Sequence, residues 1–324
     1  MLPKKYILLF VAALVLAGCN HSPEVQINVR ECAPLPSGRA SACACVADNK
    51  AYVFSGRSAG LNYLNDLWQY DPQTDSWTDL GESPMKARVN ATMAALDGKL
   101  YAGLGYSAAN AYRDSAYQRD WWQYTPSTHE WVRLVDFPSP NTVAPVSFAR
   151  NGFIYVLYGF GYGFTREIWR YDPAENTWTM LEDDWHRAQS NFGGRGAWVG
   201  GLFYYGTGFN TSNLRDWWAT DVESNNWEKR ASIPGKGREF TACTATEDYV
   251  YLFGGRHFAG DMTGGEVFET YMRYAPAKDR WEWCGTMPCG RAENQVAFTL
   301  NGKAYFGLGE DAEGNILNGL YCVE

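Results

Sequence analysis

The sequence predicts an all-β fold built from six similar units, and three observations predict it. A tyrosine followed four residues later by glycine recurs about every 50 residues, and a tryptophan recurs at a similar spacing. The chain also has 14 Trp, 21 Tyr, 16 Phe and 33 Gly, a composition that suits short strands and tight turns. Self-similarity at this period indicates a propeller or a solenoid. The Tyr/Gly pairs are Tyr52/Gly56, Tyr101/Gly105, Tyr155/Gly159, Tyr204/Gly208, Tyr251/Gly255 and Tyr305/Gly309.

Each unit is expected to contain four strands. In the first unit, residues 40–47 are small enough to approach a central axis, and residues 51–55 are apolar, as expected for a strand buried on both faces. A longer loop leads to a third strand at 67–71. Pro72 and Asp75 then turn the chain into an outer strand at 77–80.

The two ends of the chain predict a closed ring. The sixth unit stops at residues 320–323, which match the third strand of the first unit, so its fourth strand is missing. Residues 25–36 belong to no unit, yet end like the segment 285–288 that follows an outer strand. We therefore expect the N-terminal segment to complete the last unit and remove its exposed edge.

The repeated pattern resembles the kelch repeat. In the first unit Tyr52 and Gly56 are followed by Tyr70-Asp71-Pro72 and then by Trp77, and Gly254-Gly255 in the fifth unit matches the double glycine of the family. The resemblance implies a six-bladed kelch-type β-propeller that covers residues 24–324, with the ring closed by the N-terminal strand.

The first residues predict export. Lys4 and Lys5 precede an apolar stretch at 7–16, which is short for a transmembrane helix, and Leu16-Ala17-Gly18-Cys19 follows. This run resembles the lipobox of bacterial lipoproteins. The resemblance implies a signal peptide at 1–18, a lipidated Cys19 and a tether at 19–23; an ordinary signal peptide is the alternative. By analogy, Asn20 favours the outer membrane of the cell envelope.

The cysteines of the exported chain offer two candidate disulfide bonds. Export permits disulfides, but seven cysteines follow Cys19, so they cannot all pair within one chain. Cys32 and Cys322 are expected on neighbouring strands of the last unit, diagonal to each other. Cys284 and Cys289 are the competing short bridge.

Charge and composition exclude several classes of partner. The formal net charge is −8, which argues against nucleic acid, because nucleic-acid binding needs a basic surface. The chain has 4 His and no paired C-x-x-C spacing, so we expect no metal site. No nucleotide-binding fingerprint is present, so we expect no cofactor. The expected partners are the membrane, through the lipid anchor, and one ligand of a monomeric propeller.

A recurring arginine suggests a ligand site. Arg39, Arg88 and Arg238 each lie thirteen residues before the tyrosine of their unit, and Arg291 lies fourteen before its own. In the fourth unit, Asn191 occupies the position equivalent to these arginines. A ring of these residues near one mouth of the channel would suit a carboxylate or sulfate, as in an acidic sugar. The alternative is that the arginines tie the blades together through backbone carbonyls and nearby acids.

Candidates for acid–base chemistry and for sugar stacking lie on the same units. Glu239, Glu293 and His186 are the candidate acids or bases. The near-duplicates at 119–122 and 215–218 each contain two tryptophans, which we interpret as blade packing because they fall on third strands. Loop aromatics are better stacking candidates: Tyr106, Tyr112, Tyr117, Phe160, Tyr162, Phe164, Phe209 and Phe258.

Two functions remain open from the sequence. The first is a lipid-anchored kelch propeller that binds a glycan or a protein at the cell envelope. The second is a sugar isomerase, because the exported kelch propellers include N-acetylneuraminate epimerases, which are sialic acid mutarotases. A copper oxidase of the galactose oxidase type is disfavoured, because no counterpart of its His and Tyr–Cys centre is present. Whether the chain is an enzyme therefore stays undecided at this point.

Overall fold

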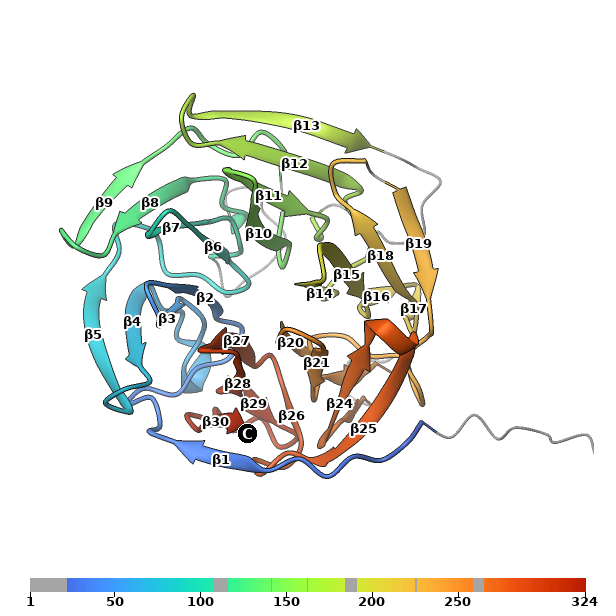
Figure 1. The fold of residues 1–324 in the computed structure, drawn as a ribbon. Helices are drawn as coiled ribbons and strands as arrows, with labels where there is room; N and C mark the ends of the chain where they lie inside the picture. The colour runs from blue at the N-terminus through green and yellow to red at the C-terminus, as the bar shows by residue number, and fades with distance from the viewer. Residues whose placement is uncertain are drawn as a thin grey trace, which may run out of the picture.

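The computed structural model describes residues 22–107, 116–140, 142–161, 163–183, 191–224, 226–258 and 265–324. Within these ranges six four-stranded antiparallel sheets stand around a central axis, as Figure 1 shows in a view along that axis. None of the helices in these ranges has the length and apolar character needed to cross a membrane. The predicted six-bladed β-propeller is confirmed.

The first three blades follow one another along the chain, each running from the axis outwards. Blade one contains β2 (Cys43–Ala47), β3 (Lys50–Phe54), β4 (Asp66–Asp71) and β5 (Ser76–Glu82). Blade two contains β6 (Thr92–Leu96), β7 (Lys99–Gly103), β8 (Trp121–Thr125) and β9 (Glu130–Arg133). Blade three contains β10 (Val146–Arg150), β11 (Phe153–Leu157), β12 (Glu167–Asp172) and β13 (Thr177–Asp183).

The remaining blades repeat this order, with two-stranded hairpins added in their loops. Blade four contains β14 (Arg195–Val199), β15 (Leu202–Gly206), β18 (Trp217–Asp221) and β19 (Asn226–Arg230), and blade five contains β20 (Ala242–Ala245), β21 (Val250–Phe253), β24 (Thr270–Ala275) and β25 (Arg280–Thr286). Blade six contains β27 (Val296–Leu300), β28 (Lys303–Gly307), β30 (Leu320–Val323) and β1 (Val29–Cys32).

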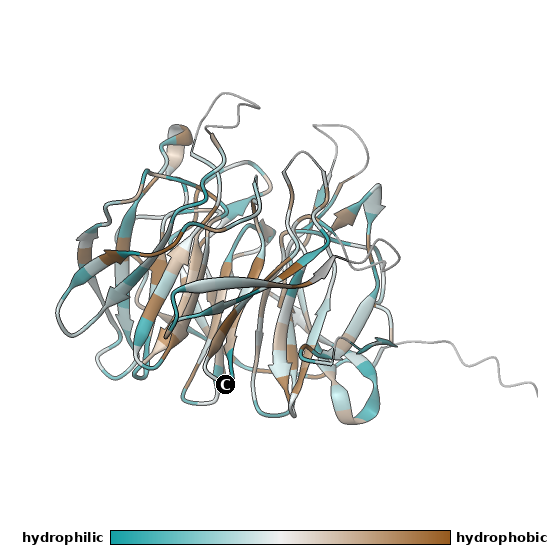
Figure 2. Cartoon of the chain, turned by 90° about the horizontal axis from the view of Figure 1, so that it is seen from above, coloured by the Kyte–Doolittle hydropathy of each residue, from teal (hydrophilic) through white to brown (hydrophobic). Residues whose placement is uncertain are grey.

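Burial explains why each strand has its composition. The second strands are buried nearly throughout, as in Ala51–Phe54, because both faces pack against neighbouring blades. The outer strands are largely exposed, as in β5. Figure 2 shows the same pattern: apolar residues lie along the strands inside the disc, and many connecting loops are polar. Trp121 and Trp217, which begin third strands, are fully buried. They pack on outer-strand tryptophans of the next blade, so these residues serve blade packing.

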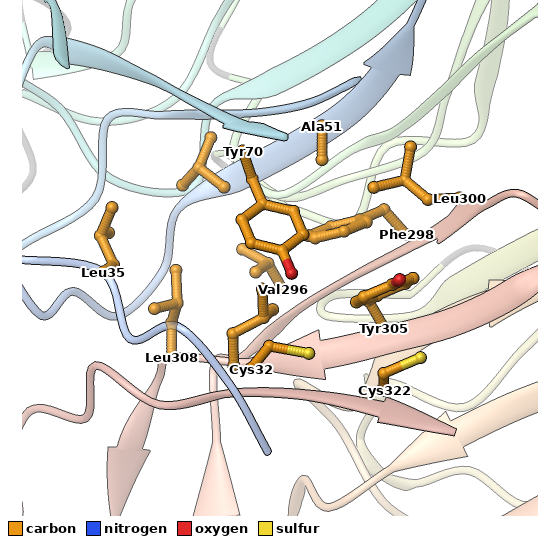
Figure 3. Close-up of a cluster of buried hydrophobic side chains, with 12 residues drawn as sticks. Cys32, Leu35, Ala51, Tyr70, Val296, Phe298, Leu300, Tyr305, Leu308 and Cys322 are labelled. Carbon is orange, nitrogen blue, oxygen red and sulfur yellow. The ribbon is translucent and has the colours of Figure 1, made fainter. Parts of the chain in front are cut away.

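The N-terminal segment closes the ring. β1 pairs antiparallel with β30 and becomes the outer strand of blade six. Cys32, the last residue of β1, is nearly fully buried, and Leu35 beyond it is fully buried, in a cluster shared by blades six and one that Figure 3 shows. Because Cys32 faces Leu320 and Arg30 faces Cys322, the two cysteines are diagonal, as expected. All seven cysteines among the described residues are free thiols, so neither candidate disulfide is formed.

A repeated hydrogen bond shows that the N-terminal segment belongs to blade six. The indole nitrogen of the outer-strand tryptophan donates to a carbonyl oxygen of the preceding blade: Trp178 to Val135 at 3.4 Å and Trp281 to Ala231 at 2.8 Å. Trp77 of blade one makes the same bond to Ala33 at 2.9 Å. Residues after β1 therefore take the place of an ordinary blade loop.

The chain before β1 is strapped onto blade five. The Val25 amide donates to the Trp283 carbonyl at 2.8 Å, and the Trp283 amide donates to the Pro23 carbonyl at 2.9 Å. Residues 23–25 therefore run parallel to β25, with Glu24 opposite Trp283. This strap holds Pro23, four residues after Cys19, against blade five.

Candidate functional site

The six blades place equivalent residue pairs around one end of the channel. In each blade the residue after the marker glycine forms a β-bridge with a residue just before the inner strand. We call these twelve residues the mouth. In blade order the pairs are Ala40–Arg57, Val89–Tyr106, Val143–Phe160, Phe192–Phe209, Glu239–Arg256 and Glu293–Glu310.

A belt of backbone hydrogen bonds holds the mouth together. The residue after the first member of each pair has a left-handed backbone conformation, for example Ser41 with φ of 56° and Asn90 with φ of 53°. In five of the six blades its amide donates to the equivalent carbonyl of the preceding blade, for example Asn90 to Ser41 at 2.9 Å, and Ser41 to Asn294 at 3.0 Å across the closure. Because these bonds join one blade to the next, they fix the blades relative to one another.

The mouth has a charged half formed by blades five, six and one. The Arg256 Nε lies 3.0 Å from Oε1 of Glu239 and 3.4 Å from Oε2 of Glu293. Arg57 pairs with Glu310, whose Oε1 accepts a hydrogen bond of 3.1 Å from the Asn294 side chain. Three carboxyl groups and two guanidinium groups therefore share one network.

Glu293 is the most perturbed acid of this network. Its side chain is 8% exposed. Burial, together with the charges of Glu310 and Glu239, raises the pKa of Glu293 from the usual 4.5 to about 7, although Arg256 and Arg57 oppose the shift. Burial also raises the pKa of Glu239. A carboxyl group that titrates near neutral pH can both donate and accept a proton.

The other half of the mouth is aromatic. Phe160 contacts Phe164 and Phe192, with ring centroids 5.4 Å apart in both pairs. Phe209 lies 5.7 Å from Phe258, and Phe192 lies 4.9 Å from Phe240. Tyr106 and Tyr117 extend the arc into blade two. These rings are half-buried, except Phe240, which is buried.

The two halves of the mouth meet at Arg256. Its guanidinium group lies 5.2 Å from the centroid of Phe240 and 5.9 Å from that of Phe258. The same side chain pairs with Glu239. A ligand that covers Arg256 would therefore contact rings on one side and carboxyl groups on the other.

The structure places Arg39 and Arg88 inside their blades. Arg39 binds both carboxylate oxygens of Asp66, at 2.8 and 2.9 Å, and Arg88 binds both oxygens of Asp120, at 2.7 and 3.0 Å. Both side chains are fully buried and also donate to backbone carbonyls. This geometry agrees with the interpretation that the recurring arginines tie the blades together. The sequence alone did not decide between that role and ligand binding.

The remaining members of the expected arginine ring differ from one another. Arg238 is buried, donates to the Gly254 carbonyl at 3.3 Å and lies over the ring of Phe268. Arg291 is exposed, because Ala292 and not Arg291 takes the equivalent position in its blade. The Ala292 carbonyl accepts the hydrogen bond from the marker glycine of blade five. Asn191 is buried and accepts a hydrogen bond of 2.8 Å from the Tyr205 hydroxyl.

Some predicted site residues lie outside the described residues. These are His186, Cys19, Tyr112 and Tyr162. Glu239 and Glu293, the other candidate acids, meet at Arg256. Within the described part of the chain, no group of three or more His, Cys, Asp or Glu is arranged to hold a metal ion.

Sequence reasoning missed Glu310, Phe192 and Phe240. Glu310 follows Gly309 as Arg57 follows Gly56, so aligning the residue after each marker glycine would have found it. Phe192 and Phe240 lie before inner strands in segments of irregular backbone. Their side chains carry no spacing signal, and only the folded ring brings them together.

Comparisons with known proteins agree with this architecture. The model of the KLHDC2/KLHL20/DRC7 Kelch-repeats domain matches residues 22–208, more than half of the chain. The prokaryotic membrane lipoprotein lipid attachment site matches residues 4–20, which include Cys19. The structure titled "Structure of YjhT" superposes with a TM-score of 0.76 at 18% identity, and covers 90% of this chain and 96% of that one.

Similar sequences include eukaryotic and bacterial propellers. Kelch-like protein 25 of Xenopus tropicalis is 26% identical over 296 residues, which are 85% of this chain and 47% of the relative, so the chain spans about half of that protein. N-acetylneuraminate epimerase of Yersinia enterocolitica is 32% identical over 120 residues, or 36% of this chain and 30% of the enzyme. The protein therefore belongs to the kelch-repeat family and is a lipid-anchored kelch propeller of the cell envelope.

Proposed function

We propose that this lipid-anchored propeller binds a glycan at the mouth. The observation that carries the proposal is the arc of half-exposed phenylalanine rings beside a network of carboxyl and guanidinium groups. Phe209 and Phe258 provide the flat apolar surface next to Arg256, and Glu239 and Glu293 lie on its other side.

The chemistry of the mouth matches the two kinds of surface on a sugar. The C–H face of a sugar ring is apolar and packs on aromatic rings, which contribute large contact areas. Its hydroxyl groups donate to carboxylate oxygens and accept from guanidinium groups, both of which the charged half supplies. The belt of backbone hydrogen bonds holds these groups on a rigid ring, so little order has to be gained on binding.

The proposal places the protein at the outer membrane. The matched lipid attachment site anchors the chain, and Asn20 directly after Cys19 supports sorting to that membrane. Four residues span at most about 14 Å, so the strap at Pro23 keeps blade five close to the lipid surface.

Replacement of Phe209 tests the binding proposal. Phe209→Ala removes a ring from the centre of the aromatic arc, and losing the burial of one such side chain costs about 1.5–3 kcal/mol, or roughly tenfold or more in affinity. We expect binding on a glycan array that includes neutral and acidic sugars, and a loss of that signal in Phe209→Ala. Isothermal titration with the glycans found gives the affinities.

Tyr249→Ala is the matched control, because Tyr249 is a half-buried ring in the turn at the opposite end of an inner strand. We expect this variant to bind as the unmodified protein does. Equal binding by Phe209→Ala and the unmodified protein would contradict a site at the mouth. Capture of a protein partner with no glycan signal would instead support the protein-binding alternative.

Sugar isomerisation is a second candidate, favoured by Glu293. Mutarotation opens the sugar ring by moving a proton from the anomeric hydroxyl to the ring oxygen, and reverses the transfer after the carbonyl group has turned. A carboxyl group with a pKa of about 7 can remove the first proton and return it. The similarity to N-acetylneuraminate epimerase supports testing that sugar first.

Glu293→Gln separates the two candidates. If Glu293 is the general acid–base group, the variant is expected to lose about 10²–10⁴-fold of the rate of anomer exchange, measured by NMR on N-acetylneuraminate. The exposed Glu130→Gln is expected to keep it. Unchanged exchange in Glu293→Gln, or no exchange above background in the unmodified protein, would contradict this activity for that sugar.

The same variant has a pH-dependent effect on stability. The raised pKa means that ionising Glu293 destabilises the folded protein, and that this cost grows between about pH 4.5 and 7. Glu293→Gln is therefore expected to unfold like the unmodified protein at pH 4 and to be more stable by up to about 3 kcal/mol at pH 8. Urea unfolding at both pH values measures the difference, and it checks that Glu293 titrates as described whether or not the protein is an enzyme.

A further inference from the structure

Next to the mouth, the channel contains a cavity of about 140 Å³. Segments from all six blades line it, and Asn90 and Ala144 of the belt form its upper edge. Most of the lining consists of small or apolar side chains. Arg195 is the one charged residue among the lining residues.

Arg195 differs from every residue at the equivalent position. It is the first residue of the inner strand of blade four, and the other inner strands begin with Cys43, Thr92, Val146, Ala242 and Val296. The fold itself therefore does not need a cation at this point. Of the six inner strands, the one in blade four begins with a positively charged residue, and this residue lines the channel.

The guanidinium group of Arg195 has no carboxylate partner among the described residues. Within the described part of the chain it makes one hydrogen bond, from Nη1 to the neighbouring Gly194 carbonyl, at 2.9 Å. By contrast, Arg39 and Arg88 each have a carboxylate on both ends of the guanidinium fork. The Arg195 side chain is half-buried, and its desolvation lowers its pKa. A charge that is partly removed from water in this way is normally paired.

The lining of the cavity suits a small anion. Thr92 and Ser147, on neighbouring blades, contribute hydroxyl groups that are hydrogen-bonded to each other at 2.5 Å, which leaves one hydroxyl hydrogen to donate to an anion. Asn90 contributes an amide. The alanines around them leave the space open. A carboxylate accepts two parallel hydrogen bonds from a guanidinium fork, and a group of that size fits the cavity.

We infer that the channel is an anion site in which Arg195 binds a carboxylate group. This proposal does not depend on glycan binding at the mouth. The carboxylate belongs either to a small free acid or to an arm of a ligand that covers the mouth. The chemistry at Arg195 is the same in both cases, so the two sources are separated by experiment.

Saturation-transfer NMR tests the site with acetate as the probe. The unmodified protein is expected to transfer saturation to the acetate methyl group, and added formate is expected to reduce this signal by competition. Arg195→Gln should lower the acetate signal at least tenfold. Arg133→Gln, which removes an exposed arginine paired with Asp136, is the matched control and should leave the signal unchanged.

Arg195→Lys keeps the proposal testable if the glutamine variant does not fold. It retains the charge but loses the planar fork, so we expect weaker acetate binding and an unchanged near-ultraviolet circular dichroism spectrum. Equal acetate signals in Arg195→Gln and the unmodified protein would overturn the site. So would the absence of any signal in the unmodified protein.

A pair of sugars distinguishes the two sources of the carboxylate. If the carboxylate is an arm of a mouth ligand, glucuronate should bind more tightly than glucose, and Arg195→Gln should abolish the difference while Phe209→Ala weakens both. If the site takes free acids, acetate should bind equally to Phe209→Ala and to the unmodified protein, and glucuronate should gain nothing over glucose. Failure at the mouth and failure in the channel therefore give different results.

Discussion

A chain that begins at Gly38 is expected to melt at least about 10 °C below one that begins at Asn20. The shorter chain lacks β1, so β30 becomes an exposed edge strand at the last blade. It also lacks Leu35 and Cys32, which are buried between blades six and one. An open edge of this kind invites pairing with a second copy, so dimers or aggregates are expected as well.

The size of the effect follows from what the segment buries. A fully buried aliphatic side chain such as Leu35 contributes about 1.5–3 kcal/mol, and the total stability of a domain is about 5–15 kcal/mol. The segment also accepts the Trp77 indole hydrogen bond at the Ala33 carbonyl, which the truncation leaves without a partner. At about 2.1 cal/mol/K of unfolding entropy per residue, each kcal/mol corresponds to about 1.5 °C for a chain of this size, so a shift of about 10 °C corresponds to a loss of roughly 6 kcal/mol.

A chain that begins at Asn28 is the control for this experiment. It keeps β1 and Leu35 but loses the strap along Trp283, so it is expected to melt within a few degrees of the chain that begins at Asn20. Melting is followed by circular dichroism, and the association state by light scattering. Equal melting temperatures for the Gly38 and Asn20 chains, both monomeric, would show that the segment does not close the ring.

The architecture could be predicted because its signals are local and repeated. The Tyr/Gly and Trp markers identify the blades because they recur with the fold, and the tryptophans Trp77, Trp178 and Trp281 make the same indole hydrogen bond to the preceding blade. Closure could be predicted for the same reason: a strand was missing at one end and an unassigned segment was present at the other. The periodicity of the sequence was therefore enough to predict that β1 pairs with β30.

The mouth could be predicted only in part. Phe160, Phe209 and Phe258 could be identified as loop aromatics, but their contact with Arg256 depends on how the blades meet around the ring. Arg195 carried no repeat signal, because it breaks the pattern of its position. Departures from a repeat are where an individual member of a family differs, and a single sequence does not show which departures face the channel.

Loss of the Arg88 side chain is expected to destabilise the propeller by about 3–5 kcal/mol, because Arg88→Met leaves Asp120 as an uncompensated carboxylate in a largely buried position. Arg88 binds both oxygens of Asp120 and the Leu104 carbonyl, so the pair joins the start of β8 to the segment that enters blade two. Urea unfolding measures the loss. Arg133→Met, which removes an exposed ion pair with Asp136, should cost at most about 1 kcal/mol.

The pH dependence identifies the pair as the source of this stability. Burial alone would raise the pKa of Asp120, but the hydrogen bonds and charge of Arg88 lower it below the usual 3.8. A lowered pKa in the folded state contributes stability above about pH 4, and this contribution is lost as the pH falls through the folded-state value. The difference between Arg88→Met and the unmodified protein should therefore shrink at pH 3.

This variant also separates the two interpretations of the recurring arginines. If Arg88 ties the blade together, a glycan or acetate should bind the folded fraction of Arg88→Met with unchanged affinity, and any lost signal should follow the unfolded fraction. If Arg88 binds a ligand directly, affinity falls while stability changes little. The fork of Arg88 is already filled by Asp120, whereas that of Arg195 has no carboxylate among the described residues. A position that recurs in the repeat is thus expected to serve the fold, and the arginine that occurs once is expected to serve the ligand.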